Sequence, residues 1–111
     1  MLPRKISSES LFKKLENLED ILLVDVRAEE KYNEYHIKSS SIEYLNIPKV
    51  NIFKLEEQEN STVSLPKDKE IIVTCTTGNS ATKCANILSE QGYNVKVLDG
   101  GITAWKEFTG E

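Results

Sequence analysis

The chain has 111 residues, of which 39% are hydrophobic and 29% are charged. This length is enough for one hydrophobic core, and this composition is atypical of a disordered segment. The formal net charge of −4 argues against a nucleic-acid-binding protein. No apolar signal-peptide core begins the chain, and no apolar run approaches the length of a membrane span. We therefore expect one domain over residues 1–111, in the cytoplasm, with neither nucleic acid nor membrane as partner.

Strand and helix patterns alternate along the chain, which favours an α/β fold with a parallel sheet. The runs that predict strands are residues 4–6, 21–27, 42–47, 71–73 and 95–98. The patterns that predict helices lie at about residues 8–18, 29–35, 52–55 and 81–91, and a turn at 99–101 leads into residues 102–106. The run at 21–27 is too densely apolar for an exposed hairpin, so we expect it to be buried on both faces.

Capping and packing signals refine these helices. Ser7 or Ser8 should cap the first helix, and Gly92 should end the helix that follows residue 81. In the second helix, we expect Tyr32 and Tyr35 to turn inward. The apolar stripe of the first helix is formed by Leu11, Leu15 and Leu18.

A cysteine stands where a buried strand gives way to a helix. Cys75 follows the apolar run 71–73, and the small polar loop 76–80 separates it from the helical pattern at Ala81. Ligands collect at the carboxyl ends of strands in open α/β sheets. Loop amides and a helix N-terminus stabilise negative charge there, and they can lower a cysteine pKa from about 8.5 to about 3.5–7.5. Gly78 would permit the positive φ that turns loop amides inward.

The stretch Cys75-Thr76-Thr77-Gly78-Asn79-Ser80 resembles the active-site loop of rhodanese-like sulfurtransferases, in which a strand-end cysteine and a glycine three residues later cradle a persulfide. The resemblance covers nearly the whole chain. Its other motifs are Asp25-Val26-Arg27, Tyr35-His36-Ile37 with Asn46-Ile47-Pro48, and Leu98-Asp99-Gly100-Gly101 with Trp105. It implies a five-stranded parallel sheet in the order 1-5-4-2-3 with helices on both faces.

The same resemblance implies a reaction. The Cys75 thiolate would attack the sulfane sulfur of thiosulfate or of a persulfide, and would then pass that sulfur to a thiol or cyanide. The persulfide would be held by the loop amides of Thr76, Thr77, Gly78, Asn79 and Ser80. No metal or organic cofactor is needed. The implied partners are small sulfur donors and thiol acceptors or a protein persulfide donor, and we expect a monomer or a weak dimer.

The loop departs from its relatives in charge. Thr76 and Ser80 occupy positions where many relatives carry arginine or lysine, and those cations help to hold anionic thiosulfate. No charged side chain occurs from Ile71 to Thr82, so thiosulfate would meet backbone dipoles and at most Lys83. The sequence therefore predicts weak binding of thiosulfate and leaves the physiological donor and acceptor open.

Several of these residues also have a purely structural interpretation. Cys75 could be a small apolar residue at the end of a core strand, and Cys84 is expected to pack in the core rather than to resolve a disulfide. Asp25 and Arg27 are expected to pair and to fix neighbouring loops. His36 is expected to be a hydrogen-bonded structural residue rather than a metal ligand, although a Cys75–His36 pair remains open. Trp105 is expected to be an aromatic residue of the core or one that backs a loop.

Two other functions compete with sulfur transfer. A binding or regulatory module of the same fold would use the loop for recognition, with the cysteine incidental. A cysteine phosphatase would need an arginine six residues after the nucleophile, where this chain has Ala81. The cysteine and glycine at the family's spacing favour the enzyme over the binding module, and the missing arginine argues against the phosphatase.

Overall fold

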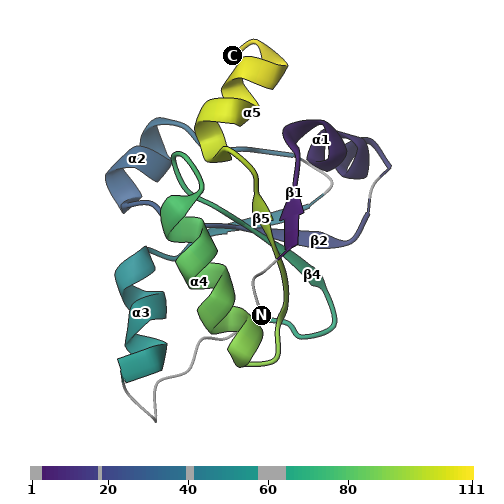
Figure 1. The fold of residues 1–111 in the computed structure, drawn as a ribbon. Coiled ribbons are helices and arrows are strands. Elements are labelled where there is room, and N and C mark those ends of the chain that lie inside the picture. The colour runs from purple at the N-terminus through teal and green to yellow at the C-terminus, as the bar shows by residue number, and fades with distance from the viewer. Residues whose placement is uncertain (1–3, 18, 40–41, 58–64) are drawn as a thin grey trace.

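The computed structural model describes residues 4–17, 19–39, 42–57 and 65–111, in which five strands form one parallel sheet (Figure 1). The strands are β1 (Arg4–Ile6), β2 (Ile21–Asp25), β3 (Glu43–Asn46), β4 (Glu70–Thr74) and β5 (Asn94–Leu98). The helices are α1 (Ser8–Glu16), α2 (Glu29–Glu34), α3 (Lys49–Glu57), α4 (Asn79–Glu90) and α5 (Gly101–Thr109). The strand order is β1-β5-β4-β2-β3, with every neighbouring pair parallel, which confirms the predicted fold and order.

The sheet is covered on both faces because its strands present apolar side chains alternately to each side. In β2, Leu22 and Val24 join a cluster with α3 and α4, whereas Ile21 and Leu23 join a second cluster with α1 and α5. Helices α3 and α4 lie side by side in Figure 1. Among the described residues, none of the helices has both the length and the apolar character to cross a membrane.

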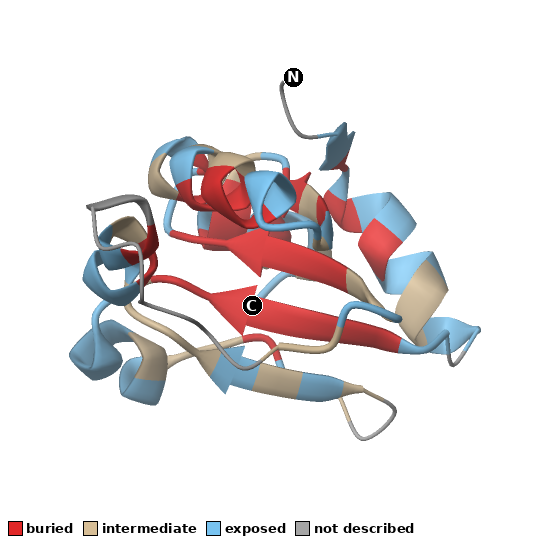
Figure 2. Cartoon of the chain, turned by 90° about the horizontal axis from the view of Figure 1, so that it is seen from below, coloured by how far each residue is buried: buried red, intermediate tan, exposed pale blue. Residues whose placement is uncertain are grey.

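Burial follows position in the sheet. All of β2 is buried, and so is β4 after its first residue, because these strands have a neighbour on each side. The edge strand β3 alternates between exposed and half-buried residues. Figure 2 shows this contrast between the red central strands and the tan and pale blue edge strand. The buried centre therefore ends at Cys75, directly after β4.

The helix ends follow the predicted signals. The Ser7 hydroxyl oxygen accepts a hydrogen bond from the Ser10 amide at 3.1 Å and caps α1. Leu11 is fully buried and Leu15 packs against the second cluster, whereas Leu18 lies outside the described residues. Gly92 has a φ of +93° and follows the end of α4, as predicted.

Of the two tyrosines expected to turn inward, Tyr35 is half-buried and packs against the second cluster, whereas Tyr32 is half-buried and joins neither cluster. The expectation for Tyr32 is wrong because its ring stacks on His36 instead of packing into the sheet. Tyr35 follows the helix with extended backbone, and its hydroxyl contacts Glu111.

Candidate active site

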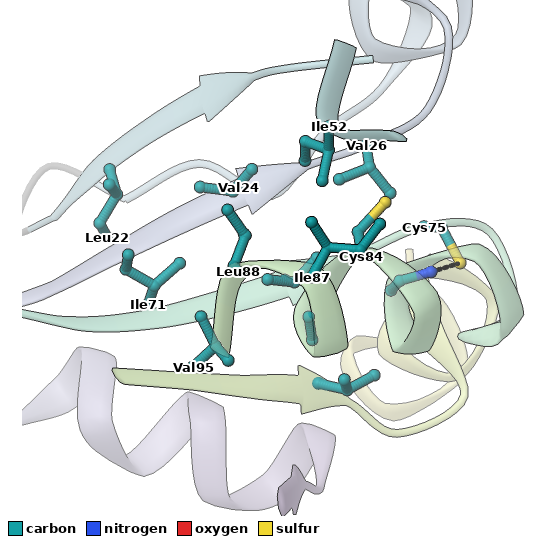
Figure 3. Close-up of a cluster of buried hydrophobic side chains, with 14 of the residues drawn as sticks. Leu22, Val24, Val26, Ile52, Ile71, Cys75, Cys84, Ile87, Leu88 and Val95 are labelled. Carbon is teal, nitrogen blue, oxygen red and sulfur yellow. Dashed lines mark hydrogen bonds between the residues drawn. The ribbon is translucent and has the colours of Figure 1, made fainter. Parts of the chain in front are cut away.

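The sulfur of Cys75 lies at the junction between β4 and α4 and is held by backbone amides. Its Sγ accepts hydrogen bonds from the Gly78 amide at 3.0 Å and from the Ala81 amide at 3.4 Å. Figure 3 marks a hydrogen bond from a backbone nitrogen to the Cys75 sulfur with a dashed line. The residue is only 6% exposed. Two donors and the N-terminal end of a 12-residue helix thus converge on one sulfur atom, which stabilises negative charge there.

The loop is shorter than the sequence predicts. Asn79 and Ser80 belong to the first turn of α4, because Gly78 caps the helix and α4 begins at Asn79, two residues before Ala81. Gly78 has a φ of +107°, and its carbonyl accepts bonds from the amide and the hydroxyl of Thr82 at 3.0 and 2.8 Å. Glycine is needed at position 78 for its backbone conformation and not for lack of space, since a Cβ there would meet no atom closer than 3.6 Å.

The two sides of the loop face different surroundings. Thr77 and Asn79 are exposed and line a small hollow of about 70 Å³ beside β5. Thr76 is exposed and Ser80 is half-buried, and both line a hollow of about 230 Å³ on the opposite side. Of the predicted loop residues, Thr76 and Ser80 therefore face the segment that follows β2.

Helix α5 supports the loop through backbone contacts that sequence reasoning missed. The carbonyl of Cys75 accepts a bond from the Ile102 amide at 2.9 Å, and that of Thr76 accepts one from Thr103 at 3.0 Å. A Cβ at Gly101 would stand 2.4 Å from the Cys75 carbonyl oxygen. The available signal was the pair of glycines in the Leu98-Asp99-Gly100-Gly101 motif, which marks a close approach of two backbone segments.

Asp25 and Arg27 form a structural pair, in agreement with the expectation for them. The guanidinium Nη2 lies 2.7 Å from Asp25 Oδ2 and also donates to the carbonyl of Tyr35. The Asn46 side-chain amide donates to the carbonyls of Asp25 and Arg27 at 3.0 and 2.9 Å. The positive charge of Arg27 is thus largely offset, and these contacts fix the segment after β2 against the end of β3.

His36 is engaged with its own surroundings. Its Nδ1 lies 2.7 Å from the Tyr32 carbonyl oxygen, and its ring stacks on the Tyr32 ring at a centroid distance of 3.8 Å. In the part of the chain that the structure describes, no three His, Cys, Asp or Glu side chains are grouped to hold a metal ion. These contacts support the structural interpretation of His36.

Cys84 is a buried thiol in the core between α4 and the sheet. Burial raises its pKa to about 12, with a smaller contribution from the charge of Cys75, so it stays protonated at neutral pH. Both cysteines are free, and Figure 3 shows the Cys84 side chain turned toward Val26. Trp105 is also a core residue, 5% exposed, in the second cluster. Neither position fits a resolving thiol or a substrate contact.

Lys83, the one side-chain cation that thiosulfate was expected to meet at most, contacts another element. Its Nζ lies 4.4 Å from the centroid of the Phe53 ring, so the side chain faces α3 through a cation–π contact. Cations do lie beside the loop, but they come from segments distant in sequence. The hollow of about 230 Å³ and a second of about 320 Å³ share Thr76, and their basic lining residues are Arg27, Lys31, Lys49 and Lys106.

Comparisons with known proteins identify a family and several relatives of this chain. The rhodanese-like domain family matches residues 8–108. A sulfurtransferase from Allochromatium vinosum is 32% identical over 102 residues, which cover 91% of this chain and 86% of that protein. The thiosulfate sulfurtransferase GlpE of Coxiella burnetii is 34% identical over 78% of this chain and 73% of its own length. A rhodanese-related protein from Thermoplasma volcanium is 28% identical, with a TM-score of 0.71 over 95% of this chain and 92% of that one.

Proposed function

Because this chain belongs to the rhodanese-like family, we propose that it is a sulfurtransferase that carries the transferred sulfur on Cys75. The observation that carries the proposal is the pair of amides, Gly78 and Ala81, that donate to the Cys75 sulfur. A sulfur atom that only fills a core has no need of two hydrogen-bond donors. Relatives named as sulfurtransferases at 32% and 34% identity support the same reaction.

The proposed reaction has two steps that conserve atoms and charge. The Cys75 thiolate attacks the outer, sulfane sulfur of the donor, the donor's S–S bond breaks, and its remaining part leaves as sulfite or as a thiolate. A new S–S bond joins the sulfane sulfur to Cys75. In the second step the acceptor, a thiolate or cyanide, attacks that outer sulfur and Cys75 leaves as the thiolate.

The cradle stabilises charge in both steps. Negative charge lies on Sγ before the first step and after the second, where the Gly78 and Ala81 amides donate to it. Between the steps, the outer sulfur of the persulfide carries the charge and needs the inward-facing amides of the loop. Catalysis is thus assigned to Cys75, and stabilisation to the Ala81 amide and the backbone of residues 76–80.

Replacement of the nucleophile tests this function. Cys75→Ser should abolish sulfur transfer from thiosulfate or a persulfide to cyanide or a thiol, because serine forms no persulfide. Cys84→Ala is the matched control, since it removes the other thiol and should keep the activity. Steady-state kinetics on folded variants, with folding checked by circular dichroism, gives the answer. A folded Cys75→Ser protein with parental activity would leave the loop as a binding module.

A further inference from the structure

The surface beside Thr76 is basic although the chain as a whole is acidic, with a formal net charge of −4. Two hollows meet at Thr76, one of about 230 Å³ and one of about 320 Å³. The larger reaches the lower end of the range of small-molecule sites, about 300–1,000 Å³. The charged side chains that line them are four cations and one acid: Arg27, Lys31, Lys49, Lys106 and Glu34.

Two of these cations are available to a ligand. Arg27 is bonded to Asp25, and the Lys106 Nζ lies 4.4 Å from the centroid of the Tyr35 ring. Lys31 and Lys49 are exposed, and neither forms an ion pair with another residue that the structure describes. A lysine at a concave site, with no internal partner, can donate to an anion with little rearrangement of the protein.

The position of these two lysines determines how far the anionic groups of a suitable donor must lie from its sulfane sulfur. They lie on α2 and α3, outside the loop that carries Cys75, and the loop itself has no charged side chain. In thiosulfate the charged oxygens are bonded to the atom that carries the sulfane sulfur, so they must lie close to Sγ. A donor whose anionic groups are several bonds from its sulfane sulfur can instead reach the cations at the edge of the site.

We propose that Lys31 and Lys49 bind the carboxylates of a small thiol's persulfide, which makes an anionic, carboxylated persulfide the sulfur donor of this protein. The inference rests on the proposed function and extends it to a substrate class. In the transfer step, the Cys75 thiolate takes the outer sulfur of the donor R–S–SH, and the carboxylated thiolate R–S⁻ leaves with the charges that the lysines held.

A matched pair of donors tests the inference. Glutathione persulfide carries two carboxylates, and the persulfide of glutathione diethyl ester carries none but has the same peptide skeleton. The rate of sulfur loading on the protein is measured against donor concentration by rapid quenching and mass spectrometry. The parent should reach half-maximal loading at about five- to tenfold lower concentration of the acid than of the diester, as expected for two partly exposed charge pairs.

The variant Lys31→Gln/Lys49→Gln should reduce that preference to about twofold or less, without changing the maximal loading rate. Lys54→Gln is the control, because Lys54 is an exposed lysine on the same helix as Lys49 and lines neither hollow. It should retain the parental preference. Added salt should weaken the preference in the parent and in the control more than in the double variant.

Three results would overturn the inference, and they separate it from the proposed function. Equal loading by the acid and the diester would remove carboxylate recognition and leave sulfur transfer standing. An equal loss of thiosulfate and glutathione persulfide loading in the double variant would show a general attraction for anions instead. Failure of the parent to load sulfur from any donor would overturn both proposals.

Discussion

Thr76 is the loop residue at which the chemistry of this site can be changed most directly. It follows Cys75, is exposed, and lines both hollows, yet it contributes no charge. The cations around it belong to other elements. This arrangement explains why a compact dianion should be a poor donor while the loop amides still stabilise the reacting sulfur.

Thr76→Arg should improve the use of thiosulfate by placing a cation inside the loop. A charge-assisted hydrogen bond stabilises binding by about 1.5–3 kcal/mol, so the Michaelis constant should fall by about tenfold or more. The persulfide of glutathione diethyl ester, which has no carboxylate, should be used as before. Steady-state kinetics with both donors tests this prediction. Efficient thiosulfate use by the parent, or no gain in the arginine variant, would show that loop charge does not set the donor preference.

Gly78 tests the amide cradle itself. Gly78→Val should reduce the rate of sulfur transfer by about tenfold or more, because a β-branched residue disfavours a φ of +107° and would turn an amide away from Sγ. Steric overlap is not the cause, since the nearest atom to a new Cβ would be 3.6 Å away. Thr77→Ala, at an exposed neighbour, should have little effect. Transfer at the parental rate by a folded valine variant would mean that Gly78 does not shape the cradle.

At the scale of elements, the N-terminus of α5 is the support on which the loop rests. Its amides bind the carbonyls of Cys75 and Thr76, and Gly101 lies against those carbonyls with no room for a side chain. The catalytic loop is therefore positioned by an element 25 residues further along the chain, counted from residue 76 to residue 101. This close approach explains why the second glycine of the Leu98-Asp99-Gly100-Gly101 motif cannot carry a side chain.

Gly101→Ala should both destabilise the protein and slow sulfur transfer. The new Cβ would stand 2.4 Å from the Cys75 carbonyl oxygen and 2.7 Å from that of Thr76, so the loop must move. Gly110→Ala is a matched control, because Gly110 also has a positive φ but its Cβ would meet nothing within 4 Å. The control should lose about 1 kcal/mol of stability from strain alone and keep its activity. Equal activity losses in the two variants, measured with urea unfolding alongside, would contradict this account.

At the scale of the whole molecule, an ion-pair network ties three elements together at the end of the sheet away from Cys75. The Glu70 carboxylate at the start of β4 lies 3.1 Å from the Lys14 Nζ of α1 and 2.9 Å from the Lys96 Nζ of β5. Burial raises the pKa of Glu70, but the hydrogen bonds from Lys96 and Lys14 outweigh burial and hold that pKa below its usual 4.5.

The lowered pKa of Glu70 makes the stability of the folded protein depend on pH in a direction that can be predicted. The ionised Glu70 contributes stability above its unfolded pKa of about 4.5, and that contribution is lost as the pH falls through the lower folded value. Glu70→Gln should therefore be less stable than the parent near neutral pH, and the difference should shrink below pH 4.5. Urea unfolding of both proteins from pH 3 to pH 8 measures this difference in stability. A difference that does not change over this range would show that Glu70 is not held in its ionised form.

Much of the fold is predictable from local patterns. The apolar runs around Leu22 and Ile72 predict strands buried on both faces, and Ser7 and Gly92 mark helix ends through their caps. Cys75 is also predictable as a strand-end residue, since the switch from apolar run to helical pattern lies in the sequence itself. These features depend on interactions within a few residues.

The parts that failed depend on contacts between distant segments. Lys83 follows the loop in sequence but faces Phe53, whereas Lys31 and Lys49 reach the loop because α2 and α3 follow neighbouring strands. Tyr32 has the spacing of a core residue, yet its ring stacks on His36 instead. Local spacing contains no information on which parallel strand ends will meet, and that information sets the charge of the site.

The most direct test is whether Cys75 carries a sulfur atom during the reaction. The protein is exposed to thiosulfate and, separately, to glutathione persulfide, and intact and peptide masses are measured before and after addition of an acceptor thiol. We expect a gain of one sulfur atom on the peptide that contains Cys75, more complete with glutathione persulfide, and the loss of that atom when the acceptor is added. No mass gain with either donor, or an equal gain in Cys75→Ser, would contradict it.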